Sequence, residues 1–296
     1  MCEFPPFQVS RIRGPVLVLQ SDDGSRVTNA LEMFQIIQFI RFCRAFLWHG
    51  IKIYFVSKRR GEEENVLRIA KLQSCGGAAI CRALNISVYV NGRLPSGKPM
   101  LIVSNHPGIL DPWILSSRLV VSFVAKIEMS RWPVFGPIGR ACGLLFADRE
   151  NRMRTSDLIG RIQDRMRDGV AVLVFPEGTT SGQDKVLPFK SGAFAAVEKM
   201  PGAIVLPIYM WVERIEGEDS NEATRKKIFW PRGMSLIKNA NQVLAIKSLD
   251  MEILVGAPIE TDKYDRKELA VIAQNKIETL ENVTRQNSSP LASRLR

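Results

Sequence analysis

The chain has 296 residues, of which 46% are hydrophobic, and 41 Lys and Arg against 30 Asp and Glu give a formal net charge of +11. This length suffices for one large domain with a sizeable core, and the basic balance favours an anionic partner such as a nucleic acid, a membrane surface or a phosphorylated substrate. Two histidines exclude a multi-histidine metal site, and five cysteines without C-x-x-C spacing predict a reducing compartment and no disulfide framework.

The first part of the chain predicts two helices that associate with a membrane. Residues 1–28 are expected to form an irregular leader. Residues 29–54 predict a helix rich in Phe, Trp and Ile, whose charges interrupt every long apolar run and so argue against a spanning segment, which needs about 20 apolar residues. An apolar face beside a cationic face is typical of a helix at the membrane interface, and a core helix with an exposed basic edge is the alternative. Residues 62–84 predict a second helix, so 29–84 form the expected membrane-association unit.

The remainder alternates between strand-like and helix-like segments, which predicts an α/β class with a central, mostly parallel or mixed sheet flanked by helices. The predicted strands are 86–90, 100–104, 120–125, 144–147, 170–175, 203–210 and 251–255. One predicted helix begins at Pro112, and four others occupy 132–142, 155–168, 192–199 and 265–280. Residues 213–235 are charged and predicted to be irregular, and 286–296 are expected to be a disordered tail. The α/β domain is therefore predicted to span 85–285.

The most distinctive stretch is a polar turn that carries His106 and Asp111 after a buried-type strand. Histidine is the natural general base near neutral pH, and a carboxylate partner can fix its tautomer and stabilise the imidazolium. Residues five apart on a continuous helix diverge by about 140°, so the pair requires the turn at Pro107-Gly108. The alternative is that Asp111 only caps the helix that begins at Pro112, and that His106 is only a polar loop residue.

Further candidate binding residues follow later predicted strands. Glu177 could accept hydrogen bonds from a polyol acceptor, or it could be a turn residue exposed to water. Lys190 precedes a predicted helix and is a candidate for binding an anionic group, and Arg149 is another unless it serves only a surface ion pair. Ligands bind beyond the carboxyl ends of strands in α/β folds, so we expect these loops to meet the His106 loop. No G-x-S-x-G motif is present, so the substrate is expected to supply the attacking hydroxyl or water.

Four blocks, in order, resemble those of the glycerolipid acyltransferases, a family that includes the 1-acyl-sn-glycerol-3-phosphate acyltransferases. The blocks are Asn105-His106-x4-Asp111, Phe146-Ala147-Asp148-Arg149, Phe175-Pro176-Glu177-Gly178-Thr179 and Val205-Leu206-Pro207-Ile208. The resemblance implies that His106 is the general base and Asp111 its partner. It also implies that the acceptor is bound by Arg149 and by the block containing Glu177, Gly178 and Thr179, and that Pro207 shapes the acyl-donor side.

The implied activity moves a fatty acyl group from acyl-CoA or acyl carrier protein to the free hydroxyl of a lysolipid. The first expectation is 1-acyl-sn-glycerol-3-phosphate as acceptor, giving phosphatidate in phospholipid synthesis, and lyso-ornithine lipid or a lysophospholipid is the alternative. The resemblance implies no bound cofactor and no metal. It implies that the partners are the lysolipid, the thioester donor and an anionic membrane surface, at the cytoplasmic face of a bacterial inner membrane.

Two positions depart from the family pattern. Gly108 stands where many members carry Ser or Gln, and Thr180 stands where many lysophosphatidate enzymes carry Arg, a good bidentate partner for phosphate. These departures leave an inactive lipid-binding relative open as an alternative. A lipid hydrolase that uses His106 to activate water also stays open, because it shares the same residues and differs only in the nucleophile. A nucleic-acid-binding protein is disfavoured, because the sequence has neither zinc-ligand spacing nor an RNP-like aromatic pattern.

Overall fold

The computed structural model describes residues 24–58, 62–148, 152–182, 185–198, 200–231 and 233–287. The strands are β1 (Ile86–Asn91), β2 (Met100–Ser104), β3 (Val121–Lys126), β4 (Leu145–Ala147), β5 (Ala171–Val174), β6 (Ile204–Ile215), β7 (Glu218–Asp219), β8 (Leu249–Val255) and β9 (Ile259–Glu260). The α-helices are α1 (Gly24–Ser57), α2 (Glu62–Ala83), α3 (Asp111–Ser116), α4 (Phe135–Ala141), α5 (Arg152–Arg167), α6 (Glu222–Arg225), α7 (Leu236–Leu244) and α8 (Arg266–Asn287). Two 3-10 helices are η1 (Ile127–Arg131) and η2 (Ser191–Ala196).

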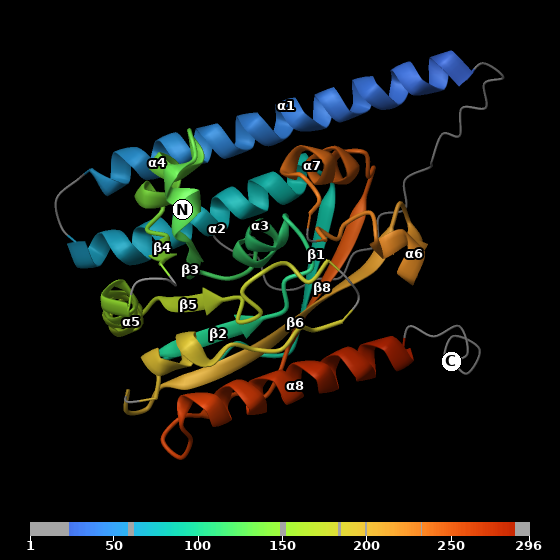
Figure 1. The fold of residues 1–296 in the computed structure, drawn as a ribbon. Helices are drawn as coiled ribbons and strands as arrows, with labels where there is room; N and C mark the ends of the chain where they lie inside the picture. Colours follow the sequence, from blue (N-terminus) through green and yellow to red (C-terminus); the bar gives the residue numbers. More distant parts are fainter. Residues whose placement is uncertain are drawn as a thin grey trace.

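One mixed sheet organises these residues and confirms the predicted α/β class. Its strand order is β1-β8-β6-β2-β5-β3-β4, with β7 and β9 paired to β6. The strands from β6 to β4 in this order are parallel, and β8 is antiparallel to β6. All five residues of β2 are buried, as expected for a strand at the centre of a sheet covered on both faces. Figure 1 shows α1, α2 and α3 on one face of the sheet and α8 on the other.

Helix α1 turns several polar side chains toward the protein and many apolar side chains outward. Gln38 is buried, and His49 packs on Gly76 of α2. Phe42 and Phe46 do face inward, where they meet the Trp113 ring edge-on. The exposed large side chains of α1 are Leu31, Met33, Ile36, Ile37, Phe39, Ile40, Leu47, Trp48, Ile51, Tyr54 and Phe55. A helix that only completed a soluble core would bury its apolar stripe, so this surface is suited to a further apolar partner. Among the helices of the described ranges, none is long and apolar enough to cross a bilayer.

The structure corrects two predicted helix boundaries in the first half of the chain. Helix α1 begins at Gly24, so it includes the end of the predicted leader at 1–28, whose first 23 residues lie outside the described ranges. The helix predicted at 132–142 is shorter in the structure, where α4 spans Phe135–Ala141, and η1 precedes it at Ile127–Arg131, outside the predicted range. Pro133 lacks a backbone donor and Val134 has a φ of 65°, so a continuous helix cannot pass through this pair.

The C-terminal half holds more regular structure than predicted. Strand β6 continues to Ile215 through residues predicted to be irregular, because β8 pairs with it and Asp250 meets the Arg214 side chain at 3.1 Å. Helices α6 and α7 were not predicted. Helix α8 continues to Asn287, so the predicted disordered tail is helical at its first two residues, and residues 288–296 lie outside the described ranges.

Candidate active site

The loop with His106 leaves the centre of the sheet at the carboxyl end of β2. The side chain of Asn105 accepts a hydrogen bond from the Met210 backbone nitrogen at 2.8 Å and donates one to the Met210 carbonyl at 3.1 Å. It thereby extends the pairing of β2 with β6 and fixes where the loop starts. The loop after β5 lies alongside, because the Ser181 backbone nitrogen donates to the His106 carbonyl at 2.8 Å. The two loops therefore meet at one edge of the sheet, as parallel strands predict.

His106 and Asp111 form a directly bonded pair. The distance from Nδ1 of His106 to Oδ2 of Asp111 is 2.6 Å, and the same carboxylate oxygen accepts a hydrogen bond from the Gly108 backbone nitrogen at 2.9 Å. The imidazole ring stacks on Phe175 with 3.9 Å between ring centroids. The side chain of His106 is 19% exposed, whereas that of Asp111 is buried. An ionised Asp111 holds the proton on Nδ1, which leaves Nε2 as the nitrogen that can accept a proton from a substrate.

Asp111 is not the N-cap that the alternative interpretation requires. The N-cap of α3 is Leu110, and no side chain caps this helix; Asp111 is its first residue and directs its carboxylate back to His106. Burial raises the pKa of the Asp111 carboxyl above its ordinary value, and the hydrogen bonds from His106 and Gly108 oppose this increase. The carboxylate therefore depends on these two donors to stay charged in the interior.

Glu177 is buried and supports the loop that carries His106. Its side chain is 2% exposed, so the alternative of a turn residue in water is wrong. One carboxyl oxygen accepts a hydrogen bond from the His106 backbone nitrogen at 3.0 Å. Burial raises the pKa of Glu177 to about 8, and the negative charges of Asp111 and Glu281 add to this increase. Glu177 thus positions the loop, and a role in holding the acceptor stays a prediction.

The raised pKa of Glu177 makes the stability of the fold depend on pH. The ordinary pKa is 4.5 and the pKa in the fold is about 8, so folding takes up a proton between these values and stability falls as the pH rises through this window. For one proton, the free energy of unfolding falls by about 1.4 kcal/mol per pH unit. Glu177→Gln keeps the size and the acceptor oxygen without the charge, so we expect it to remove this part of the pH dependence. Urea unfolding of both proteins from pH 5 to 9 measures it, and parallel profiles would contradict the burial argument.

The other predicted binding residues occupy different surroundings. Gly178 closes a turn with φ of 71° and donates to the Phe175 carbonyl, and Thr179 beside it is half-buried. Lys190 is exposed at the N-cap of η2. Pro207 is buried within β6 opposite Val103, and its carbonyl accepts from the Gly256 nitrogen. Arg149 lies outside the described residues, so its predicted contact with the acceptor stays a prediction.

Residues 228–231, here named the strap, cross the loop that carries His106. Phe229 forms a β-bridge with Gly108, and the Trp230 nitrogen donates to the Pro107 carbonyl at 3.1 Å. A Cβ atom at Gly108 would lie 2.6 Å from the Ile228 carbonyl oxygen, so only glycine permits this approach. The Thr180 hydroxyl donates to the Trp230 carbonyl at 2.7 Å. The two departures from the family pattern, at Gly108 and Thr180, are therefore both contact points of the strap.

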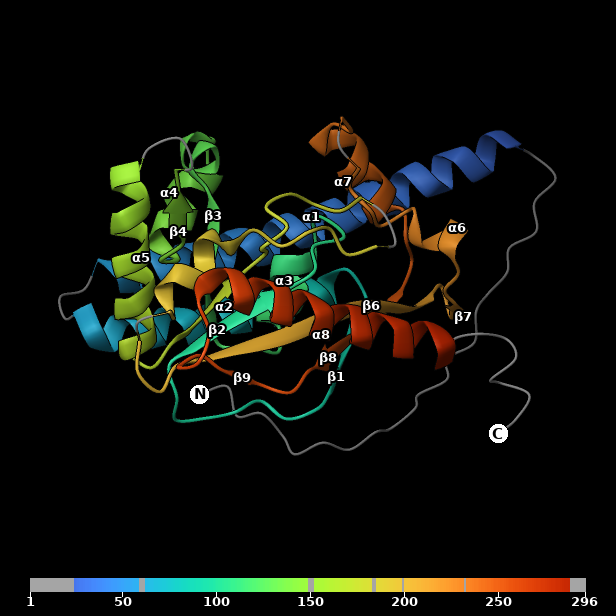
Figure 2. The same cartoon turned by 60° about the horizontal axis from the view of Figure 1, so that its bottom comes forward.

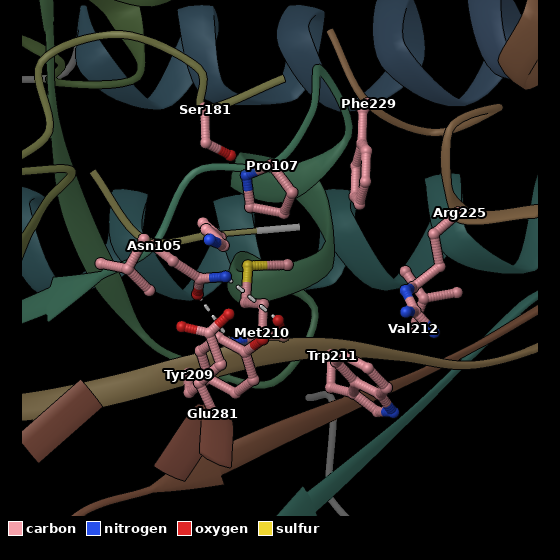
Figure 3. Close-up of a pocket in the computed structure, with 12 residues that line it drawn as sticks. Asn105, Pro107, Ser181, Tyr209, Met210, Trp211, Val212, Arg225, Phe229 and Glu281 are labelled. Carbon is pink, nitrogen blue, oxygen red and sulfur yellow. Dashed lines mark hydrogen bonds between the residues drawn. The ribbon is translucent and has the colours of Figure 1, made fainter. Parts of the chain in front are cut away.

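A pocket lies beside the residues that flank His106 (Figure 3). It is lined by Asn105, Pro107, Ser181, Lys185, Val186, Tyr209, Met210, Trp211, Val212, Arg225, Phe229 and Glu281. The Arg225 guanidinium lies over the Trp211 ring, 4.3 Å from its centroid. Trp211, Arg225 and Glu281 were not predicted as site residues, because no local motif contains them. Within the described ranges, no group of three or more His, Cys, Asp or Glu side chains could hold a metal ion.

The chain is similar to known acyltransferases. The sequence model of the Acyltransferase family matches residues 85–211. Lyso-ornithine lipid O-acyltransferase of Brucella abortus is 32% identical over 68% of the chain and 78% of its own length, and that of Rhizobium meliloti is 31% identical over 67% and 70%. A 1-acyl-sn-glycerol-3-phosphate acyltransferase of Neisseria meningitidis is 32% identical over 45% of the chain and 52% of its own length. The crystal structure of the 1-acyl-sn-glycerophosphate acyltransferase PlsC of Thermotoga maritima shares the fold, with a TM-score of 0.61, 21% identity, and coverage of 87% of this chain and 97% of that one.

Proposed function

The chain belongs to the glycerolipid acyltransferase family, and on this basis we propose that it transfers a fatty acyl group from a thioester to the free hydroxyl of a lysolipid, with His106 as the general base. The observation that carries the proposal is the 2.6 Å contact between Nδ1 of His106 and Asp111. This contact orients the imidazole and stabilises its protonated form, which is the requirement for taking a proton from a hydroxyl.

The transfer balances without a protein nucleophile. Nε2 of His106 takes the proton of the acceptor hydroxyl as the hydroxyl oxygen attacks the thioester carbonyl carbon. A C–O bond forms, and the tetrahedral intermediate then loses the thiolate as the C–S bond breaks. The thiolate of coenzyme A or acyl carrier protein takes up the proton from the imidazolium, which returns His106 to its starting form. Asp111 remains ionised throughout and stabilises the imidazolium.

The acceptor that this site suits best is lyso-ornithine lipid. Two relatives that match about two thirds of the chain, those of Brucella abortus and Rhizobium meliloti, act on this lipid, as their names state. An ornithine head group carries an ammonium and a carboxylate instead of a phosphate. At the position after Thr179, where many lysophosphatidate enzymes carry Arg, this chain has Thr180, whose hydroxyl is engaged by the strap. The cation that would favour a phosphate over other head groups is missing at this position.

The outer surface of α1 supports a location at a membrane surface. Its exposed apolar side chains form an extended face, and Arg41, Arg44 and Lys52 are exposed among them. An apolar face with cationic neighbours suits the boundary between acyl chains and anionic head groups. The inner surface of α1 packs on Trp113 of α3, the helix that begins with Asp111. This packing holds the catalytic pair close to the helix that we place in the membrane interface.

Acyl transfer by the purified protein tests both the reaction and the acceptor. Palmitoyl-CoA and palmitoyl acyl carrier protein are each offered with lyso-ornithine lipid or lysophosphatidate, and thiol release and ester product are followed together. We expect ester product with a kcat/KM for lyso-ornithine lipid about tenfold or more above that for lysophosphatidate, because the site lacks one charged phosphate partner. A preference for lysophosphatidate would contradict the acceptor proposal alone. Thiol release without ester product would support the hydrolase alternative.

A further inference from the structure

Helix α7 presents an apolar turn to the outside at its N-terminal end. Ser235 caps the helix by accepting a hydrogen bond from the Lys238 nitrogen at 3.2 Å, and the first turn exposes Leu236 and Ile237. The side chain of Ile237 is 74% exposed. The opposite side of the helix is anchored in the protein, because Asn239 and Val243 are buried. The exposed turn is therefore held in place by a buried face and is not a frayed end.

Helix α7 lies beside α1. The side chain of Gln35 on α1 donates a hydrogen bond to the Asn241 carbonyl of α7 at 3.2 Å. The exposed side chains of Met33, Ile36 and Ile37 lie within one helical turn of Gln35. Figures 1 and 2 both show α7 beside one half of α1, with α8 on the other face of the sheet. Helix α7 and the outer surface of α1 therefore lie on the same side of the sheet, and both carry exposed apolar side chains.

The chemistry of this combined surface favours lipid as its occupant. Lys238 is exposed next to Ile237, and Arg41 and Arg44 are exposed on α1, so the apolar side chains are accompanied by positive charges. The chain as a whole has a net charge of +11. Anionic head groups above acyl chains complement both features, and the acceptor of the reaction is itself a lipid. We propose that the N-terminal turn of α7 is a second membrane-insertion point, which enters an anionic bilayer surface beside α1.

The position of α7 affects the site because the strap connects this helix to the catalytic loop, the loop after β2 that carries His106. Asn239 of α7 donates a hydrogen bond from its side chain to the Phe229 carbonyl at 2.9 Å. Phe229 in turn forms the β-bridge with Gly108, two residues from His106. Insertion of α7 would therefore fix the distance between the catalytic loop and the bilayer surface. This inference rests on the proposed function, since it takes the acceptor to lie in the bilayer.

The test compares Ile237→Glu with Val271→Glu in the full chain. Val271 is 58% exposed on α8, so the control adds the same charge to a similarly exposed position on the other face of the sheet. Binding is measured by flotation with vesicles of equimolar phosphatidylcholine and phosphatidylglycerol. We expect Ile237→Glu to weaken binding about tenfold or more relative to the control, because an inserted apolar side chain is lost and a negative charge meets anionic lipid. Activity on acceptor embedded in vesicles should fall in parallel, while activity on a monomeric short-chain acceptor should equal that of the control.

Equal vesicle binding by the two variants would overturn the proposal. A change in sedimentation on Ile237→Glu without any change in vesicle binding would overturn it as well, because it would assign this surface to a second copy of the chain. The proposed function is tested by a different measurement. If the unmodified protein transfers no acyl group to any lysolipid, the proposed reaction is refuted, whereas vesicle flotation measures binding and does not depend on turnover. The two failures are therefore distinguished by which measurement changes.

Discussion

Replacing His106 with alanine lowers kcat for acyl transfer by about 10²- to 10⁴-fold, the range expected when a general base is lost. Nδ1 of His106 is bonded to Asp111, and the ring is supported by Phe175, so the imidazole is held for proton transfer through Nε2. Alanine removes the base while the backbone contacts of His106 with Glu177 and Ser181 remain available. The chain should therefore fold while losing turnover, and thiol release together with ester formation measures the loss.

The chain provides a matched control in its other histidine. Nδ1 of His49 lies 2.9 Å from the carbonyl of Ala45 in its own helix, on α1 and not in the catalytic loop. His49→Ala should keep kcat close to that of the unmodified protein, and circular dichroism should give similar helix content for all three proteins. If His106→Ala retained most of its activity in ester formation, His106 would not be the base. The reaction would then need another group to take the proton.

The contact between His106 and Asp111 could be predicted from the sequence because the two residues lie in one loop. His106 and Asp111 are five residues apart, and Pro107-Gly108 between them indicates the turn that brings their side chains together. The sheet could be predicted for a related reason, since the buried strands are short apolar runs bounded by turn residues. The run 100–104 corresponds to β2 residue for residue. Local pattern was sufficient for these elements, because the contacts and burial that define them are encoded within one or two turns of the chain.

The strap and α7 could not be predicted, because their structure depends on contacts between distant residues. Trp230 bonds to Pro107, and Gln35 bonds to Asn241 206 residues later. Charged and aromatic residues at 213–235 have no periodicity that would indicate these partners. The burial of Glu177 was missed for the same reason, because the His106 nitrogen that it accepts from is 71 residues earlier. Only the strap gives a physical reason for Gly108, which from the sequence is just a departure from a family pattern.

Asp111→Asn should lower kcat by about 10²- to 10⁴-fold without unfolding the protein, because asparagine keeps the shape of the side chain and loses its charge. In the unmodified protein one carboxylate oxygen accepts from both Nδ1 of His106 and the nitrogen of Gly108. The amide oxygen can take the place of this carboxylate oxygen and accept from both donors, but it carries no negative charge to stabilise the imidazolium. If the NH₂ group takes this place instead, the imidazole must accept through Nδ1 and carry its proton on Nε2, which is the wrong tautomer for a base that acts through Nε2.

The size and direction of the effect separate this role from a structural one. Burial raises the pKa of Asp111, so the charged carboxylate is costly in the fold and its replacement by a neutral amide should not destabilise the protein strongly. We therefore expect the midpoint temperature of thermal unfolding of Asp111→Asn to lie within a few degrees of that of the unmodified protein. We also expect a large loss of kcat and little change in KM for the acyl donor. A variant that lost stability but kept kcat per folded molecule would make Asp111 a support of α3 alone. Retained stability with lost turnover would instead show that the charge of Asp111 acts through the tautomer and the imidazolium of His106.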